Sequence, residues 1–106
     1  MFSFLNKTKF NSITASELVN LHDKITLIDV REVDEYRNGH VPNAKNITMN
    51  SLLENPEKYL DKSKEYHIIC QSGMRSMRTC DKLSAMGFNV VNVKGGTSSY
   101  TGNLQR

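Results

Sequence analysis

Residues 66–87 read YHIICQSGMRSMRTCDKLSAMG, and this stretch decides the fold. A short apolar run at 66–70 ends in a cysteine, and a polar loop containing a glycine follows it directly. Residues 76–86 then carry apolar side chains at helical spacing, and Gly87 is well suited to end the helix. A buried strand, a short loop and a helix in this order are typical of an α/β protein with parallel strands.

The rest of the chain repeats this alternation of strands and helices. Thr14 and Glu17 have the spacing of a capping box, which predicts a helix that starts there. Further strands are predicted at 25–30, 44–48 and 90–93, and further helices or turns at 33–38, 50–60 and 98–104. The predicted fold is an open, mainly parallel α/β sheet of about five strands with helices on both faces. We expect residues 1–106 to form one domain with a core at about 13–104.

The composition excludes several classes of protein. The chain has 106 residues, of which 38% are hydrophobic and 24% charged, so it can form a core and is not typical of a disordered protein. No apolar run approaches the ~20 residues of a membrane span, and the apolar start of the chain is too short for a signal peptide. The net charge of +3 is spread without a basic run. We therefore expect a cytoplasmic monomer that binds neither membrane nor nucleic acid.

Cys70 and Cys80 are the two cysteines of the chain. In a reducing compartment such a pair indicates a reactive thiol or core packing more often than a disulfide. His22, His40 and His67 form no zinc-ligand spacing with them, so we predict no metal and no organic cofactor. Cys80 falls on an apolar helical face, which favours core packing, with a role as resolving thiol for Cys70 as the alternative.

The loop after the predicted strand 66–70 carries the candidate chemistry. Ligands of open α/β sheets bind beyond the carboxyl ends of the strands, which is where Cys70 stands. Consecutive loop amides and the start of the next helix form an anion-binding concavity, and such a concavity favours the thiolate over the thiol. The candidate site is therefore the nucleophile Cys70 with an anion-binding loop made of Gln71, Ser72, Gly73, Met74, Arg75 and Ser76.

Alternatives remain open for two of these residues. Cys70 is either reactive or a buried core cysteine, and the glycine, arginine and helix start that follow it favour the reactive interpretation. Arg75 either faces the pocket, where it attracts an anionic donor, or pairs with an acidic side chain at the surface.

Taken together, these motifs resemble the rhodanese homology domain over about 13–104. The resemblance rests on LIDVRE at 27–32 with GHVPNAKNI at 39–47, on the loop at 70–76, and on VKGG at 93–96. In this order and spacing the combination is highly specific. The sequence departs from the family at Asn43 and Tyr100, where glycine and tryptophan are frequent.

The resemblance implies a sulfurtransferase of the thiosulfate sulfurtransferase type. Its cysteine, here Cys70, attacks the outer sulfur of thiosulfate or of a protein persulfide, holds it as a persulfide, and passes it to a thiol or to cyanide. The resemblance also implies structural ion pairs around the strand end for Asp29, Arg31 and Glu35. His40 lies in a turn, where a hydrogen-bonding role is expected and a general base is the alternative.

Two other functions are alternatives to sulfur transfer. A cysteine-dependent phosphatase or arsenate reductase carries C-x5-R, whereas Cys70 to Arg75 form C-x4-R, a tighter loop better suited to one added sulfur than to a phosphoryl group. A rhodanese-like interaction or regulatory module without catalysis is the other alternative. The presence of Cys70 argues against it, because inactive relatives typically lose this cysteine.

Overall fold

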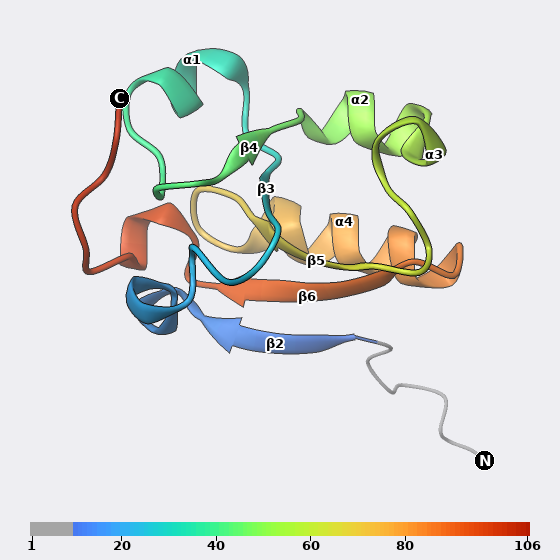
Figure 1. The fold of residues 1–106 in the computed structure, drawn as a ribbon. Coiled ribbons are helices and arrows are strands. Elements are labelled where there is room, and N and C mark those ends of the chain that lie inside the picture. Colours follow the sequence, from blue (N-terminus) through green and yellow to red (C-terminus); the bar gives the residue numbers. More distant parts are fainter. Residues whose placement is uncertain (1–9) are drawn as a thin grey trace.

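The computed structural model describes residues 10–106, and its centre is a sheet. Within these residues the sheet has five strands in the order β2-β6-β5-β3-β4, and every neighbouring pair is parallel (Figure 1). The strands are β2 (Asn11–Thr14), β3 (Leu27–Asp29), β4 (Lys45–Asn46), β5 (Glu65–Ile69) and β6 (Asn89–Lys94). The predicted open, parallel α/β sheet is therefore confirmed. Because all strands run the same way, their carboxyl ends meet at one edge, where ligands of such sheets bind.

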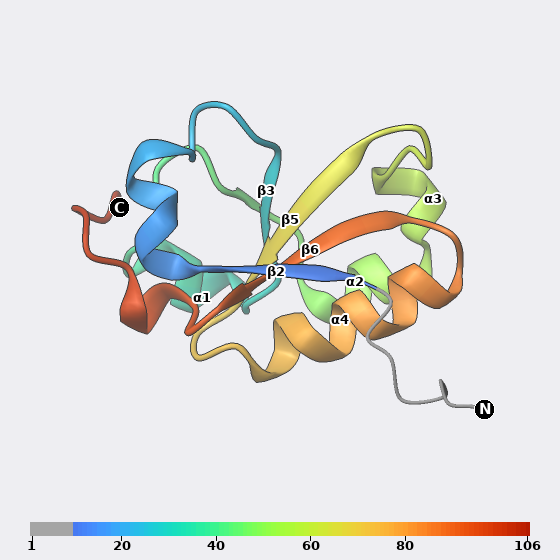
Figure 2. The same cartoon turned by 90° about the horizontal axis from the view of Figure 1, so that it is seen from below.

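Helices connect the strands and cover both faces of the sheet (Figure 2). One face carries α2 (Met49–Glu54), α3 (Pro56–Tyr59) and α4 (Met74–Ala85). The other face carries the 3-10 helices η1 (Ala15–Asn20) and η2 (Thr97–Ser99) and the short helix α1 (Val33–Arg37). In residues 10–106 none of these helices is long and apolar enough to cross a membrane.

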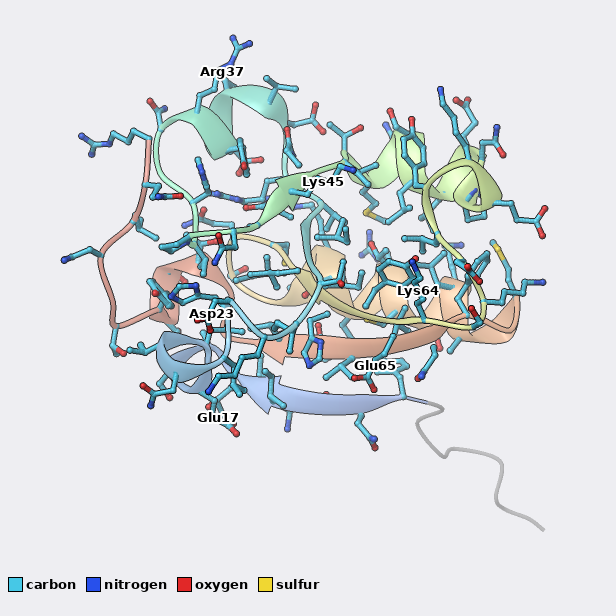
Figure 3. All side chains as sticks on the ribbon, viewed as in Figure 1. Glu17, Asp23, Arg37, Lys45, Lys64 and Glu65 are labelled. Atoms are coloured by element: carbon cyan, nitrogen blue, oxygen red, sulfur yellow. The ribbon has the colours of Figure 1, made fainter. Side chains whose placement is uncertain are left out.

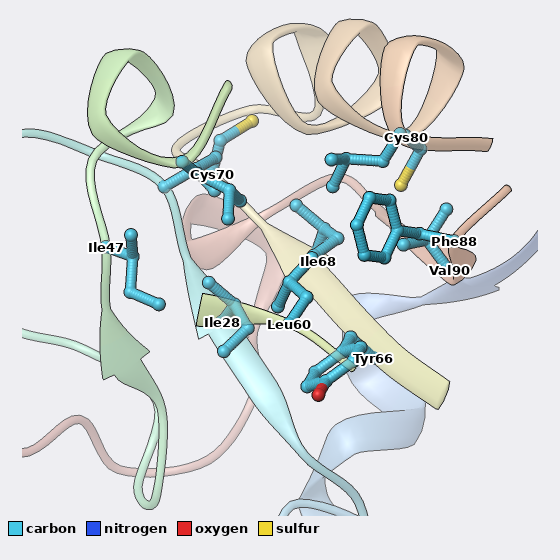
Figure 4. Close-up of a cluster of buried hydrophobic side chains, with 12 residues drawn as sticks. Ile28, Ile47, Leu60, Tyr66, Ile68, Cys70, Cys80, Phe88 and Val90 are labelled. Carbon is cyan, nitrogen blue, oxygen red and sulfur yellow. The ribbon is translucent and has the colours of Figure 1, made fainter. Parts of the chain in front are cut away.

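The core is divided by the sheet into two apolar clusters. On the α4 side, Ile28 and Ile68 of the strands pack with Cys80 and Phe88 (Figure 4). On the other side, the neighbouring strand residue Ile69 belongs to the second cluster. Successive strand residues point to opposite faces, so a strand covered on both sides needs a continuous apolar run. Charged side chains such as Glu17, Arg37 and Lys64 lie on the outside (Figure 3).

The elements differ from the predicted ones mainly at the ends of the chain. Strand β2 was not predicted, because its sequence NSIT is mostly polar; it lies at the sheet edge, where a strand needs little apolar surface. The Thr14 amide does donate to the Glu17 carboxylate at 2.8 Å, but the helix that follows is of the 3-10 type. The helix or turn predicted at 98–104 corresponds to the short 3-10 helix η2, which begins at Thr97 and ends at Ser99.

Candidate active site

Cys70 directly follows β5, at the carboxyl edge of the sheet. Its side chain is 1% exposed, and its sulfur points toward the first turn of α4 (Figure 4). The Sγ atom accepts hydrogen bonds from the backbone N–H of Gly73 at 3.1 Å and of Ser76 at 3.2 Å. The sulfur is therefore buried, yet two amides of the following loop are turned toward it.

These two N–H groups lie at the start of α4 and use the sulfur as their hydrogen-bond acceptor. The first N–H groups of a helix have no acceptor within the helix, and Ser76 is the third residue of α4. Gly73 precedes the helix with φ +108°, a conformation that glycine adopts without the strain other residues meet. Partial positive charge at the helix start stabilises an anion placed there, so this geometry favours negative charge on Cys70 Sγ.

The hydroxyl of Ser76 is the third polar group beside the sulfur. Ser76 is buried, and its Oγ lies 3.3 Å from Cys70 Sγ and 3.2 Å from the carbonyl oxygen of Gly73. When the cysteine is a thiol, its S–H donates to this Oγ while the hydroxyl donates to Gly73. When the sulfur is charged, the same hydroxyl can rotate and donate to it, because a hydroxyl is both donor and acceptor. The site thus solvates both protonation states without moving its backbone.

A segment from the end of the chain holds the loop from outside. The backbone N–H of Thr97 donates to the Cys70 carbonyl at 2.9 Å, and that of Ser98 donates to the Gln71 carbonyl at 3.0 Å. Gly96 precedes them with φ +63°, and a Cβ atom there would overlap the carbonyl of Cys70. The VKGG motif at 93–96 contributes to the family resemblance, but its contact with the loop is not evident from the sequence.

Arg75 forms an ion pair with Glu35. Its guanidinium donates to the two carboxylate oxygens at 2.8 and 2.9 Å, and each side chain is about one-third exposed. The hydrogen bonds from Arg75 lower the pKa of Glu35 to about 2. Of the two alternatives for Arg75, the structure shows the pairing with an acid. The resemblance implied structural ion pairs for Asp29, Arg31 and Glu35, and in the structure the partner of Glu35 is Arg75, 40 residues further along the chain.

Asp29 and Arg31 form the other, buried ion pair. The Arg31 guanidinium donates to Asp29 Oδ2 at 2.9 Å, and both side chains are at most 3% exposed. Arg31 also donates to the Gly39 carbonyl at 2.8 Å and to Gln71 Oε1 at 3.0 Å. A buried guanidinium needs several acceptors, and these three residues supply them. The pair therefore supports the loop through Gln71, a link that the sequence did not predict.

His40 is held in a turn. Its ring stacks on Tyr36 with centroids 3.7 Å apart, and its Nδ1 lies 2.9 Å from the Tyr36 carbonyl oxygen. Its backbone N–H donates to the Gln105 carbonyl at 2.9 Å. These contacts correspond to the structural interpretation of His40 rather than to a general base.

Cys80 lies in the core rather than in the site. It is fully buried on α4, and its sulfur points toward Phe88 (Figure 4). Burial, and secondarily the charge of Cys70, raises the pKa of Cys80 to about 12. Both cysteines are free thiols. Core packing, the first of the two interpretations of Cys80, is the one that the structure supports.

Two hollows flank the loop in the described part of the chain. The larger, of about 1040 Å³, is lined on the loop by Ser72, Gly73 and Met74. The smaller, of about 510 Å³, is lined by Gln71, by Arg31 and by Tyr100. Cys70 itself lines neither hollow, so its sulfur lies beneath the loop that separates them.

The fold and the site define a class of protein: an open α/β sheet that presents one cysteine thiol to the amides of a strand-to-helix loop. Residues 14–103 match the family described as the rhodanese-like domain, and the chain belongs to that family. The match covers all predicted site residues.

Relatives whose names refer to sulfur transfer are similar to this chain over most of its length. "Putative sulfurtransferase YtwF" of Bacillus subtilis is 42% identical over 94 residues, which cover 89% of this chain and 90% of YtwF. GlpE of Coxiella burnetii, named a thiosulfate sulfurtransferase, is 35% identical over 83 residues, which cover 78% of this chain and 76% of GlpE. The family and these relatives support sulfur transfer as the general class of activity.

Solved structures of similar size share the fold. SSP1007 of Staphylococcus saprophyticus superposes with a TM-score of 0.82 at 34% identity, covering 92% of this chain and all of that one, 100%. A rhodanese-like domain protein of Staphylococcus aureus has a TM-score of 0.79 at 35% identity, covering 91% of this chain and 97% of that one.

Proposed function

We propose that this protein is a sulfurtransferase that moves sulfane sulfur through a persulfide on Cys70. The observation that carries the proposal is the position of Cys70 Sγ, which accepts hydrogen bonds from two backbone N–H groups at the start of α4. Backbone dipoles that are already oriented stabilise negative charge without reorganising during the reaction. A site of this kind suits a nucleophile that is an anion before the reaction and after it.

In the first step the Cys70 thiolate attacks the outer sulfur of the donor. With thiosulfate, a new S–S bond forms to Cys70, the S–S bond of thiosulfate breaks, and sulfite leaves with the electron pair. The product is a Cys70 persulfide, whose outer sulfur carries the negative charge. We expect that charge to be stabilised by N–H groups of the loop 71–76 and of the start of α4, of which those of Gly73 and Ser76 already donate to Cys70 Sγ.

In the second step an acceptor removes the outer sulfur. A thiolate or cyanide attacks that atom, the S–S bond to Cys70 breaks, and the electron pair returns to Cys70 Sγ. The amides of Gly73 and Ser76 and the Ser76 hydroxyl stabilise the thiolate that is regenerated. No metal and no organic cofactor enters either step.

The other predicted residues act by positioning the loop. Arg75 is engaged by Glu35, and Arg31 is engaged by Asp29 and Gln71, so both cations fix the loop to neighbouring elements. We further propose thiosulfate or a protein persulfide as donor and a thiol or cyanide as acceptor. A monomer in a reducing, cytoplasmic setting suits this chemistry, because such a setting keeps the thiol of Cys70 free.

The test is a mass measurement of the intact protein after incubation with thiosulfate. We expect a gain of roughly 32 Da, one sulfur atom, which disappears when cyanide is added. Cys70→Ser should abolish the gain. Cys80→Ser is the matched control, because it removes the other thiol and should leave loading unchanged.

The alternatives predict different outcomes of the same experiment. A protein that releases phosphate from an aryl phosphate and gains no sulfur would be a cysteine-dependent phosphatase. A protein that does neither would be a non-catalytic rhodanese-like module. Sulfur loading that persists in Cys70→Ser and is lost in Cys80→Ser would contradict the assignment of the nucleophile.

A further inference from the structure

Asn92, in the middle of β6, is a buried amide without a partner. Its side chain is 1% exposed, and neither its Nδ2 nor its Oδ1 forms a hydrogen bond to any described residue. Buried polar groups are nearly always hydrogen-bonded, and a central strand position normally favours an apolar side chain. Within the described residues the carboxamide of Asn92 therefore has unused hydrogen-bonding capacity.

Asn92 is among the residues that line the larger hollow beside the loop, and its two polar atoms are buried in the wall of that hollow. Strand residues alternate between faces, so Asn92 faces the same side as Val90, the side covered by α4. The hollow is a groove of about 1040 Å³ lined by residues of β2, β6 and α4, and β6 lies between α4 and the edge strand β2 in Figure 1. One end of the groove is formed by Ser72 and Gly73. Cys70 does not line the groove itself, and the N–H of Gly73, which donates to Cys70 Sγ, connects the groove wall to the sulfur beneath it.

The groove lining has the chemistry of a peptide site. The free carboxamide of Asn92 offers one donor and one acceptor side, which together complement a peptide group. Met74 and Met77, which line the α4 side, are 69% and 52% exposed, and methionine adapts to varied apolar side chains. Arg78 and Lys94 also line the groove and provide two cations against the single acid Asp81. The volume reaches the upper end of the range for small-molecule pockets, roughly 300–1000 Å³.

We propose that this groove binds an extended, acidic cysteine-containing segment of a partner protein, which accepts sulfur from Cys70. The inference rests on the proposed function, because a thiol bound in the groove can accept sulfur only if Cys70 carries it. The thiolate of the bound segment attacks the outer sulfur of the Cys70 persulfide and forms a new S–S bond. The S–S bond to Cys70 breaks, the electron pair stays on Cys70 Sγ, and the segment leaves as a persulfide.

The first experiment compares acceptors on wild type and on Asn92→Leu, a substitution of similar volume. The protein is loaded with thiosulfate, and discharge of the persulfide is followed with a short blocked peptide that has one cysteine between glutamates. We expect Asn92→Leu to raise the peptide concentration for half-maximal discharge about tenfold, because a hydrogen-bonded pair is lost. Discharge by cyanide and by 2-mercaptoethanol should change less than about twofold, since neither needs the groove.

Stability separates this effect from a structural role of Asn92. Leucine removes an unpaired buried amide, so the thermal midpoint of Asn92→Leu should be unchanged or higher while use of the peptide is lost. The inference is wrong if Asn92→Leu discharges to the peptide as wild type does. It is equally wrong if wild-type protein shows no preference for the peptide over 2-mercaptoethanol.

A second variant tests the groove without touching the core. Arg78→Glu with Lys94→Glu reverses two exposed charges and should raise the half-maximal peptide concentration by about tenfold or more. A peptide with lysines in place of the glutamates should recover most of this loss. Lys64→Glu, an exposed charge reversal outside the groove, is the control and should behave as wild type. If the double variant needed the same half-maximal concentration of the glutamate peptide and of the lysine peptide, the inference would be overturned.

The two proposals fail in different ways. If wild-type protein gains no sulfur from thiosulfate, the proposed function is wrong and the groove inference falls with it. If all variants load sulfur and discharge it to cyanide, but none discriminates between acceptors, only the groove inference is wrong.

Discussion

At the scale of single residues, Asn43 shows what a departure from a family pattern means physically. The family resemblance placed a frequent glycine at this position, and the structure gives Asn43 a φ of +72°. Asparagine is one of the few residues other than glycine that adopts this left-handed conformation at modest cost. Its side-chain nitrogen also lies 3.0 Å from His22 Nδ1.

We predict that Asn43→Ala lowers the free energy of unfolding by about 1 kcal/mol, the cost of the left-handed conformation for a residue with a plain Cβ. Asn43→Gly should stay within about 0.5 kcal/mol of wild type, because glycine meets no such cost. Urea unfolding at equilibrium measures both. An alanine variant as stable as the glycine variant would show that backbone strain is not the reason for asparagine here.

How far single residues could be predicted depends on what their role requires. Cys70 was predicted because a strand end, a glycine and a helix start lie within seven residues, so the pattern is local. Asn92 was not predicted as a candidate, because its side chain stands out only by lacking hydrogen bonds. Whether a side chain has hydrogen-bond partners depends on the residues that surround it in three dimensions. The sequence of β6, NVVNVK, gives no indication of whether Asn92 has a hydrogen-bond partner.

At the scale of elements, the Glu35–Arg75 pair connects α1 to the first turn of α4. The sequence could not predict this pairing, because several acids compete for Arg75 and only the packing of two helices brings Glu35 to it. The same limit explains why β2 was not predicted and why the sequence did not indicate that the helix after Thr14 is of the 3-10 type. Tertiary contacts determine these features, whereas β3 and β5 could be predicted because each contains a local run of apolar residues.

The Glu35–Arg75 pair should make stability depend on pH in a defined window. The pKa of Glu35 is lowered from 4.5 to about 2, so the carboxylate stabilises the fold fully above pH 4.5. This contribution is lost as the pH falls toward 2. Because both side chains are about one-third exposed, solvent screening limits it to about 1 kcal/mol.

We therefore predict that Glu35→Gln is less stable than wild type by about 1 kcal/mol at pH 7 and equally stable near pH 2. Thermal unfolding at the two pH values measures this difference. Glu54→Gln, which changes an exposed acid of α2, is the control and should match wild type at pH 7. A Glu35→Gln difference that is the same at both pH values would rule out the ion pair as its cause.

At the scale of the whole molecule, the active-site loop is built by two distant parts of the chain. The loop follows β5, but its carbonyl groups at Cys70 and Gln71 are bound by the backbone of Thr97 and Ser98, which follow β6. Neighbouring parallel strands place both segments at the same edge of the sheet. The position of Cys70 therefore depends on the C-terminal part of the fold as much as on its own loop.

Two glycines separate the effect of backbone strain from the effect of this contact. Gly87 and Gly96 both have positive φ, +96° and +63°. A Cβ atom at Gly87 would meet only the side chain of Lys62 at 3.9 Å, which is ordinary contact. A Cβ atom at Gly96 would overlap the carbonyl of Cys70 and the backbone of Gln71.

We predict that Gly87→Ala lowers the free energy of unfolding by about 1 kcal/mol and leaves the rate of sulfur loading unchanged. Gly96→Ala should lose about 2–4 kcal/mol, because overpacking adds to the strain. It should also load sulfur from thiosulfate at least about tenfold more slowly, because the displaced carbonyl of Cys70 shifts the sulfur from the amides of Gly73 and Ser76. Urea unfolding and timed mass measurements, made where both variants are folded, give the two quantities. Equal loading rates in the two variants would mean that the segment after β6 supports the fold without positioning the nucleophile.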